Sequence, residues 1–567
     1  MLTVATGENQ SDQYLCELLL EWGLPFSSAS WSNLDPERQP LFLIQGKCRL
    51  TQQERDALRH FVESGGALIV IGADLGLGDL LGVDIKGPLT DGWLRLKSHS
   101  IGCGLKSSLH IFGGVRALAR DPTDCVGYLV NDREENIGDA IVIRRFGRGL
   151  TIFLAPDVTR SILHIQQGLR IEEDGSPAPD GSAPIDDGIL KAEDGLVLDW
   201  EKDRIKVNGL PFFGRPITDE LRILLLQTIL FAASEKNLPL PMISLWSKGR
   251  RAMGLVSHDT DGNDPELGYA LLEEVNRIGI ESCWCIIYPG QYPKDLYRRI
   301  VDSDGEIALH YDALTESPLT RWSQKSLRGQ RDWLIRETGF SPVSNKNHYT
   351  RWEGRLEFYR WCQQLGLRAE QSKGPSKLGT LGFPFGGCHP WRPFDDESED
   401  PQVIDVWSLN LLTQDLVVDP SGVNKERHPI MVSASYGEHL IDEALRVGGL
   451  AHFLFHPAHI KKPGTAAALE RLVAYGRDRG LEWQTSAQIA EWLTQRSFWV
   501  ASAKVFWATG SWILRGWSSL PGSRLLALAP RPILSKSEPV QYWFGFPFRL
   551  VAEDLTGGDF ALSPEGQ

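Results

Sequence analysis

Long apolar runs, basic charge and clustered cysteines are all scarce in this chain of 567 residues. No apolar stretch reaches the roughly 20 residues that a membrane-spanning helix needs, so we expect no membrane partner. Lys and Arg total 59 against 73 Asp and Glu, giving a formal net charge of −14. This balance argues against nucleic acid or an anionic membrane as a partner.

Two further absences bear on the cellular compartment in which the protein is expected. The N-terminal stretch lacks a basic segment followed by an apolar core, so we expect no signal peptide. Eight cysteines in a chain of this length do not form a disulfide framework. Cys283 and Cys285 have the spacing of one face of a strand, and small buried core residues explain them better than a metal or redox pair. A cytoplasmic location is the expectation.

The length predicts several domains. The first domain is predicted over residues 1–240, and about its first 155 residues alternate between strand and helix patterns, with buried strands predicted at 41–46 and 67–72. A capping box of Thr51 and Glu54 opens the helix between them, and residues 140–156 resemble a hairpin. This order predicts an N-terminal doubly wound, flavodoxin-like α/β domain. The acidic stretch 172–188, rich in Pro, Gly and Ser, is predicted to be a mobile loop or linker that buries little apolar surface.

A second strand–helix alternation covers residues 241–497. The predicted strands are "MGLVS", "CWCII", "EIALH", "VSN", "VIDVW", "IMVS" and "AHFLFH". About seven strands, each followed by a helix, are typical of a distorted (β/α)7 barrel. Residues 498–567 change to short Trp-rich runs between Gly and Pro turns, which predict a small β-rich C-terminal domain.

Ionisable residues gather at the ends of four predicted barrel strands. The stretch "VSHDTDGND" brings Asp259 and Asp261, "EIALH" ends in His310, "NKNHYTRW" contains His348, and "LFHPAH" contains His456. The carboxyl ends of barrel strands meet at one mouth, where catalytic groups collect. Taken singly, the two aspartates could be a solvated turn with Gly262, and each histidine a core, capping or surface residue.

Together these residue types suit metal-assisted hydrolysis of an ester or amide. One Asp with two His can bind Zn²⁺ or a similar ion and leave positions open for water and substrate. A second carboxylate can accept a proton from the water, and a histidine across the mouth can protonate the leaving group.

The stretches "SHDTDG", "EIALH" and "LFHPAH" resemble motifs of the polysaccharide deacetylase (NodB-homology, carbohydrate esterase family 4-like) superfamily over about residues 252–495. The resemblance implies a deacetylase-type barrel, with Asp259 as catalytic base and Asp261 and His310 as metal ligands. It further implies His456 as general acid and Arg351 as the arginine that orients the base. One divalent ion, Zn or else Ni, Co or Fe, is the implied cofactor.

The chain departs from the family at Leu314, where a second metal-binding histidine is expected. A related branch of deacetylase-like proteins carries a similar His-Tyr-x-Arg stretch. His348 is therefore the predicted third ligand, with Asp312 as the substitute.

Aromatic side chains are the candidates for binding sugar. Trp391, in the Gly/Pro-rich stretch "GFPFGGCHPWRPFD" with Cys388 and His389, and Trp407 are predicted sugar-stacking surfaces. Tyr349 is the third predicted substrate-binding residue. The acidic composition favours neutral or cationic glycans over strongly anionic ones.

The N-terminal domain resembles a degenerate class I glutamine amidotransferase-like domain. The strand "ALIVIG" leads into Ala73 and Asp74 without a nucleophilic cysteine, and Cys48 lacks the glycine-rich setting of that family. A structural role, including homo-oligomer formation, is therefore expected in place of amidotransfer.

Three functions follow for the whole chain. The first is a divalent-metal hydrolase that removes acetyl or other acyl groups from an N- or O-acylated carbohydrate. The second is a catalytically degenerate carbohydrate-binding or scaffold protein, suggested by Leu314. The third is a glycosidase-like hydrolase, which needs two carboxylates about 5 to 9.5 Å apart on either side of the bond.

Overall fold

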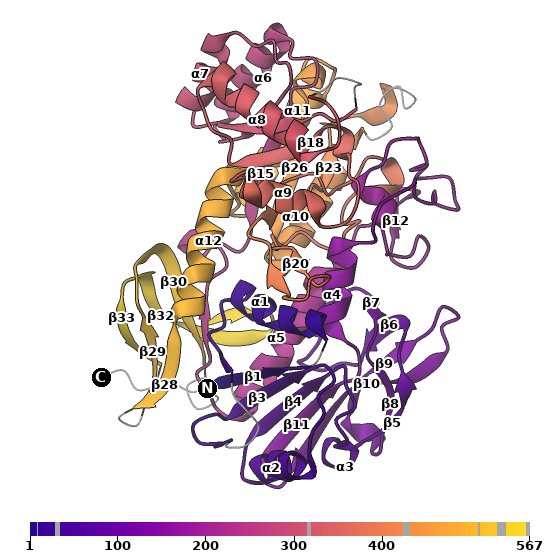
Figure 1. Cartoon of the computed structure of the whole chain (residues 1–567), viewed down its shortest axis with the longest axis vertical. Coiled ribbons are helices and arrows are strands. Elements are labelled where there is room, and N and C mark those ends of the chain that lie inside the picture. The colour runs from indigo at the N-terminus through magenta and orange to yellow at the C-terminus, as the bar shows by residue number, and fades with distance from the viewer. Residues whose placement is uncertain are drawn as a thin grey trace.

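The computed structural model describes residues 1–7, 9–28, 34–314, 319–422, 431–508, 511–529 and 540–562. Figure 1 shows an N-terminal sheet at one end of the molecule, a curled sheet surrounded by helices at the other, and a C-terminal β region on one flank. Among the described residues, no helix is long and apolar enough to span a membrane.

The N-terminal sheet has 11 strands and is parallel only in part. Five strands run in the parallel order β2-β1-β3-β4-β11. Their bounds are β1 Leu2–Thr6, β2 Ser27–Ser28, β3 Leu41–Gln45, β4 Ala67–Ile71 and β11 Gly149–Leu154. The predicted strands at 41–46 and 67–72 are thus confirmed, and so is the capping box at the start of α2 (Gln52–Glu63).

The rest of this sheet is antiparallel and differs from a flavodoxin-like domain. The predicted hairpin is present as β10 (Asn136–Phe146) paired with β11, and the sheet continues through antiparallel neighbours. These are β9 Cys125–Val130, β6 Asp91–Leu96 and β7 Leu109–Phe112, with β5 Val83–Pro88 and β8 Val115–Ala119 beside them. The remaining helices are α1 Tyr14–Glu21, α3 Gly78–Leu81, α4 Val158–Gln167 and α5 Ile217–Glu235.

The second sheet is parallel and curls into a half-barrel. Its order is β22-β19-β18-β17-β16-β15-β26-β23, and β27 also pairs with β15. The bounds are β15 Met253–Asp259, β16 Cys283–Ile287, β17 Glu306–Tyr311, β18 Ser344–Asn347, β19 Ala369–Glu370, β22 Trp407–Ser408, β23 Thr413–Gln414, β26 Leu450–Leu454 and β27 Glu482–Trp483. The two edges, β22 and β23, are successive segments of one stretch of chain, which joins them across the opening.

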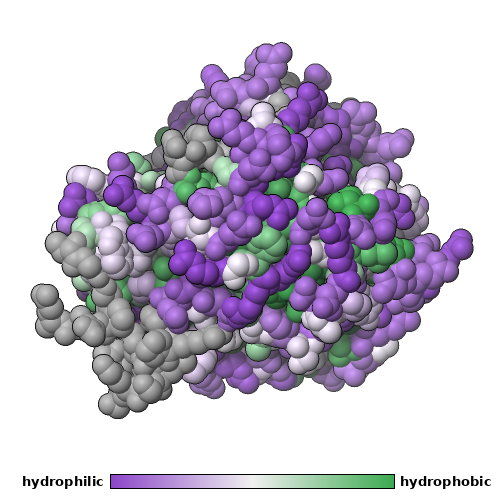
Figure 2. Space-filling view, turned by 90° about the horizontal axis from the view of Figure 1, so that it is seen from below, coloured by the Kyte–Doolittle hydropathy of each residue, from purple (hydrophilic) through white to green (hydrophobic). Residues whose placement is uncertain are grey.

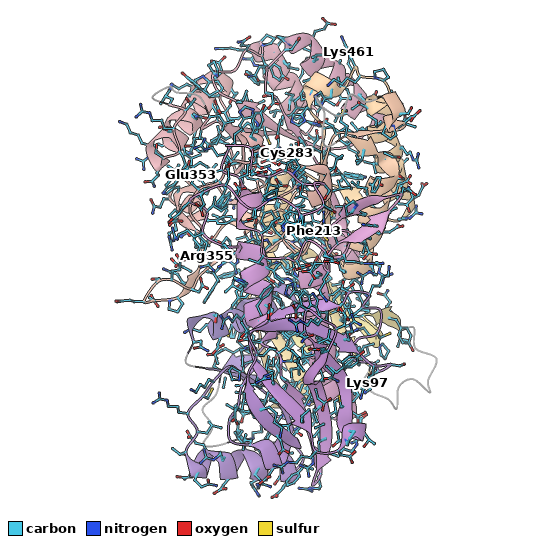
Figure 3. The ribbon with its side chains drawn as sticks, turned by 90° about the vertical axis from the view of Figure 1, so that its right-hand side faces the viewer. Lys97, Phe213, Cys283, Glu353, Arg355 and Lys461 are labelled. Carbon is cyan, nitrogen blue, oxygen red and sulfur yellow. The ribbon has the colours of Figure 1, made fainter. Side chains whose placement is uncertain are left out.

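Seven helices flank this sheet. They are α6 Pro265–Ile278, α7 Lys294–Asp302, α8 Gln324–Thr338, α9 Glu357–Gln364, α10 Ala434–Val447, α11 Thr465–Asp478 and α12 Ser486–Ser502. Cys283 lies inside the barrel region (Figure 3). Its Sγ is 4.0 Å from that of Cys285, and both side chains are fully buried, as expected of core residues.

Two predicted barrel strands are corrected. Val432–Ser433 of "IMVS" forms β25, which pairs only with β24 (Leu416–Val417) in a separate two-stranded sheet, while Ile430 lies outside the described residues. Of "VIDVW", only Trp407 belongs to the barrel sheet, since Val403 pairs with β20 (Phe394–Asp395). Short β19 carries too little pattern for prediction.

Residues 172–188 are packed and do not behave as a linker. Ala178, Ala183 and Ile185 are buried together against Trp200, which corrects the expectation that this stretch buries little apolar surface. Its backbone also reaches the barrel, because the Gly379 amide donates to the Ser182 carbonyl at 3.1 Å. The acidic stretch therefore joins the two halves of the molecule.

The C-terminal region is β-rich, as its sequence predicts. A four-stranded sheet has the order β14-β30-β32-β31 and a three-stranded sheet the order β28-β29-β33. The bounds are β14 Pro241–Ile243, β28 Lys504–Ala508, β29 Ser511–Gly516, β30 Leu520–Leu528, β31 Gln541–Trp543, β32 Phe546–Leu555 and β33 Gly558–Ala561. Because β14 comes from the junction at residue 241, this sheet is built from two distant parts of the chain.

Candidate active site

The alternation of β15 decides which side chains enter the barrel mouth. His258 points away from Asp259, packs against Trp284 with ring centroids 4.8 Å apart, and has Nδ1 2.8 Å from the Phe455 carbonyl. Burial lowers the pKa of His258 to about 4. Ser257 and Asp259, two residues apart, both contact Lys346 and therefore share the inner face.

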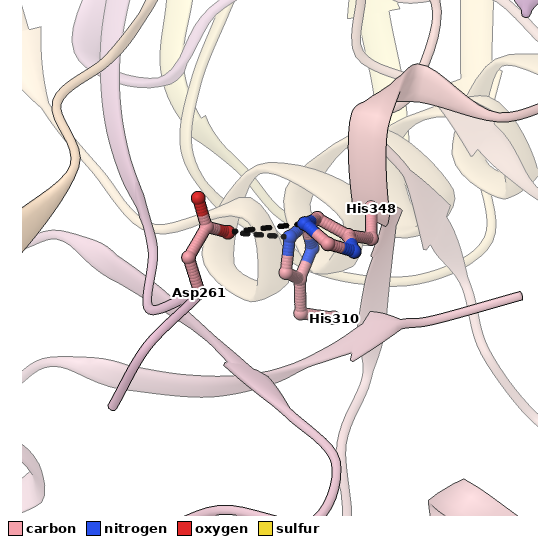
Figure 4. A group of neighbouring side chains, drawn as sticks. All are labelled: Asp261, His310 and His348. Carbon is pink, nitrogen blue, oxygen red and sulfur yellow. Dashed lines mark ion pairs between the residues drawn. The ribbon is translucent and has the colours of Figure 1, made fainter. Parts of the chain in front are cut away.

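Three side chains from different segments converge just beyond the strand ends. Oδ1 of Asp261 lies 3.3 Å from Nε2 of His310 and 3.7 Å from Nε2 of His348 (Figure 4). The three potential ligand atoms all lie within 4.8 Å of one another. Within the described part of the chain, no hydrogen bond ends on Asp261 Oδ1 or His310 Nε2. Buried atoms left in this way fit a metal ion as their partner.

The opposite ring nitrogens hold both histidines in the orientation that a metal site needs. Nδ1 of His310 is 2.9 Å from the Lys346 carbonyl oxygen, and Nδ1 of His348 is 3.2 Å from Asp312 Oδ1. With the Nδ1 proton donated to these acceptors, each Nε2 is free to bind a metal ion. Asp312 therefore supports His348 from behind, and it does not replace it as the predicted substitute ligand.

The charges around Asp261 favour its ionised form. Burial acts to raise the pKa of Asp261, but the His310 imidazole and the His456 charge outweigh burial and hold this pKa well below its usual range. For His310, burial lowers the pKa, but the Asp259 and Asp261 carboxylates more than compensate and raise it. The site is thus built around a carboxylate that stays negative.

Asp259 lies beside Asp261 but has a different partner. Its Oδ2 is 3.8 Å from His310 Nε2, and its Oδ1 is 3.4 Å from Nζ of Lys346. The side chain of Lys346 is 1% exposed, and its ammonium also lies 2.5 Å from Ser257 Oγ. A buried cation therefore sits directly under the predicted base.

The predicted role of Arg351 is corrected. Its guanidinium pairs with Glu353, which is labelled in Figure 3, and no ion pair joins Arg351 to Asp259 among the described residues. His348 opens the short η6 turn (His348–Thr350) and lines the cavity, whereas Arg351, just after the turn, pairs with Glu353. Lys346 supplies the positive charge in its place.

His456, two residues after strand β26, also lines the barrel mouth. Its Nε2 is 3.7 Å from Asp261 Oδ2, and its Nδ1 is 2.5 Å from Asp415 Oδ2. Asp415 also accepts a hydrogen bond from the His456 backbone amide at 2.9 Å, and Nδ1 of His459 lies 2.7 Å from its Oδ2. Burial acts to lower the pKa of His456, but Asp415 outweighs it and raises this pKa to about 9.

These groups open into a cavity of about 310 Å³. Its lining includes the residues above and a rim formed by Asp187, Lys191, Tyr349, Thr350, Ser376, Lys377, Gln414 and Met431. Tyr349 is 56% exposed and lies at this rim. Asp261, Tyr349 and Thr350 have φ values of 28°, 58° and 54°. Such left-handed backbone is strained for residues other than glycine and gathers at functional sites.

Two predicted sugar-stacking residues are corrected. Trp391 is 0% and Trp407 2% exposed, so neither ring offers a face to a ligand. Nε1 of Trp407 donates to Thr494 Oγ1 at 3.0 Å. Cys388 and His389 are also buried, with His389 Nε2 2.7 Å from the Val447 carbonyl. The Gly/Pro-rich stretch is therefore core structure and not a substrate loop.

The sequence alone predicts no role for Lys346, Asp415 or His459. Lys346 stands inside the quoted stretch "NKNHY", where a lysine on the inner face of a strand could have been noticed. Asp415 lies just after the two-residue strand β23 in "LLTQDLVV", which carries no catalytic pattern. The fold alone brings it under His456.

Comparisons with known proteins give structural matches only. No family model matches the chain, and no curated protein matches it. The carbohydrate deacetylase Agd3 matches with a TM-score of 0.40 and 9% identity, over 99% of this chain and 98% of that one. A candidate polysaccharide deacetylase from Mycobacterium smegmatis matches with a TM-score of 0.34 and 17% identity, over 44% of this chain and 93% of that one.

A third match is a family 4 acetyl xylan esterase from Clostridium thermocellum, solved with a cobalt ion, with a TM-score of 0.24 and 14% identity. It covers 42% of this chain and 89% of that one. By their descriptions, two of these neighbours are deacetylases and one is an acetyl xylan esterase. The amidotransferase-like resemblance of the N-terminal domain stays a prediction. Identities and TM-scores this low carry no functional argument, so function has to be argued from the geometry of the site.

Proposed function

We propose that the chain is a divalent-metal-dependent hydrolase that removes acyl groups, such as acetyl, from an N- or O-acylated carbohydrate. One observation supports this most strongly. The Asp261 carboxylate faces the Nε2 atoms of His310, His348 and His456, and each of these rings is fixed through Nδ1 by its own acceptor. Histidines held in this way are typical of catalytic metal sites.

Asp261, His310 and His348 would hold the ion. One carboxylate and two imidazoles suit Zn²⁺, with Ni, Co or Fe as alternatives, and they leave positions free for water and substrate. A bound divalent ion would polarise the acyl carbonyl and make a water more acidic. Asp261 is 37% exposed at its side chain, so the site is open to the cavity.

Asp259 is the proposed base. Its carboxylate is next to the ligand set, 3.8 Å from His310 Nε2, and can take a proton from the attacking water. The Lys346 ammonium, 3.4 Å from Oδ1, pairs with this carboxylate and would fix its direction. Lys346 is a positioning residue in this scheme, since it acts through Asp259.

His456 is the proposed general acid. Its pKa of about 9 keeps the imidazole protonated at neutral pH. Nε2 faces the mouth, and Nδ1 is anchored on Asp415 at 2.5 Å. From this position Nε2 can donate its proton to the leaving nitrogen or oxygen when the acyl bond breaks.

The two alternatives fit the geometry less well. A degenerate binding protein is suggested by Leu314, but His348 supplies an imidazole in the ligand set without it. A glycosidase needs carboxylates on opposite sides of a bond. Asp259 and Asp261 both approach the same nitrogen, Nε2 of His310, at 3.8 and 3.3 Å, so they share one side.

Acetate release tests the proposal. The full chain, treated with chelator and reloaded with Zn²⁺, should release acetate from at least one member of a panel of N- and O-acetylated sugars. Chelator alone, or the variant Asp261→Ala, should abolish release. Metal-independent release, or no release from any acetylated sugar by the reloaded protein, would overturn the proposal.

A further inference from the structure

One wall of the cavity comes from the N-terminal half of the chain. Residues 168–216, between α4 and α5, run along the barrel, and isolated bridges join Lys191 to Arg351 and Ile171 to Gly354. The Trp352 amide donates to the Leu190 carbonyl at 3.0 Å. These backbone contacts fix the segment around Lys191 to the loop that carries His348.

Two ammonium groups share a single carboxylate in this wall. Nζ of Lys377 lies 2.6 Å from Asp187 Oδ2, and Nζ of Lys191 pairs with the same oxygen. The side chain of Lys191 is 2% exposed and that of Lys377 15%. All three residues line the same cavity as Asp261 and the histidines.

Among Lys191, Asp187 and Lys377, two ammonium groups therefore share one carboxylate, and both lysines line the cavity. Each ammonium has three hydrogens to donate, and in the described residues neither pairs with a second carboxylate. The Glu193 carboxylate also attracts Lys191, but its oxygens accept hydrogen bonds from Ser376 and Thr380, and it is not among the described residues that line the cavity. A buried charge without a full partner is costly, and an anionic group entering the cavity would relieve that cost.

We propose that Lys191, Asp187 and Lys377 form a subsite for a substrate carboxylate, so that the substrate is an acylated sugar acid. This inference rests on the proposed function for its substrate class, and it reverses the expectation of a neutral or cationic glycan drawn from overall composition. The net charge of −14 describes the whole surface, whereas the buried wall meets the ligand.

Binding calorimetry on the full chain tests the subsite. The probes are N-acetylmuramic acid and 2-acetamido-2-deoxyglucuronic acid, which carry the carboxylate on different arms, each compared with its methyl ester. The zinc-loaded protein should bind at least one acid about tenfold more tightly than its ester, as expected for one charge-assisted contact. Lys377→Met and Lys191→Met should reduce this preference to below about twofold.

Lys248→Met is the matched control, because Lys248 is 67% exposed and pairs with Glu482 on the surface. It should keep the full preference. The buried substitution Lys191→Met could lower stability, which a thermal melt would show. In that case Lys377→Met, at a less buried position, still tests the subsite. If the probe's carboxylate instead binds the zinc ion, the preference for acid over ester should disappear in chelator-treated protein but persist in Lys377→Met.

The outcomes separate the two proposals. Equal binding of acid and ester, no binding of either acid, or a preference that survives Lys377→Met would overturn the subsite. Metal-dependent acetate release from neutral sugars would then still support the hydrolase. A carboxylate preference that depends on Lys377, without acetate release from any sugar, would support the subsite and overturn the hydrolase.

Discussion

Asp259 and Asp261 are two residues apart, yet the structure gives their carboxylates different neighbours. Asp261 faces three imidazoles, whereas Asp259 meets the Lys346 ammonium at 3.4 Å. The first arrangement suits a ligand and the second a base held by a cation. Substitutions at the two positions should therefore separate metal binding from turnover.

Asp259→Asn should lower acetate release by at least about 100-fold, because the amide cannot accept the proton of the attacking water. Bound zinc should stay at the wild-type level, since Asp259 is not one of the proposed ligands. Metal analysis and initial rates on the same sample check both halves. Unchanged release would remove Asp259 as the base.

Lys346→Met should lower the rate by about 10-fold or more while zinc is retained, because the base loses its buried partner. Lys346→Arg keeps the positive charge and should recover part of the rate. Rates for both variants, with a thermal melt for each, separate a positioning effect from a loss of fold. A Met variant as fast as the Arg variant would contradict the assigned role.

At the scale of elements, stability measurements can show that Trp391 is a core residue and not a sugar-binding surface residue. The Trp391 ring is 0% exposed, and its Nε1 donates to Asn410 Oδ1 at 3.3 Å. Trp391→Ala should cost about 3–5 kcal/mol of unfolding free energy, and Trp391→Phe less. Denaturant unfolding measures both. A sugar-binding defect in Trp391→Phe without loss of stability would restore the stacking role.

Asp12, at the C-terminal edge of the N-terminal strands, should make stability fall as pH rises. Burial, followed by the charge of Asp157, raises its pKa to about 7. The folded chain then keeps a proton between about pH 4 and 7 that the unfolded chain has lost, so rising pH in this window costs stability.

Asp12→Asn should remove this cost. The variant should be more stable than the wild type at pH 8, by on the order of 1 kcal/mol, and the difference should shrink towards pH 4. Unfolding curves at both pH values provide the measurement. A difference that does not change with pH would show that Asp12 titrates normally.

Apolar runs predicted the longer strands well, because β3, β4, β15 and β17 are buried on both faces and need continuous hydrophobic sequence. Elements of two residues, such as β19, β22 and β23, leave no such pattern. "IMVS" fails for the opposite reason, since its apolar character serves a separate small sheet. Pattern length thus limits what can be predicted.

The residues of the candidate site also divide into those that the sequence predicts and those that it does not. Asp259, Asp261, His310 and His456 follow strand ends that the sequence reveals, and parallel topology then brings them together. Lys346 and Asp415 act through contacts between segments distant in sequence, which no local pattern encodes. Trp391 and Trp407 were misjudged because an aromatic residue alone does not show whether its face is covered.

At the scale of the whole molecule, the N-terminal half takes part in the cavity. Asp187 and Lys191 belong to it by sequence but line the barrel mouth. Seen from below, the surface is mainly hydrophilic, with hydrophobic residues in several separate groups (Figure 2). Formation of a homo-oligomer through the N-terminal domain stays a prediction.

Metal stoichiometry is the most direct test of the central claim. Wild-type protein, stripped with chelator, reloaded with Zn²⁺ and desalted, should carry one ion per chain by elemental analysis. His348→Ala and His310→Ala should each lose most of it, whereas Lys248→Met, changed on the surface, should keep it. Absence of stoichiometric metal in the wild type, or undiminished metal in His348→Ala, would contradict the account.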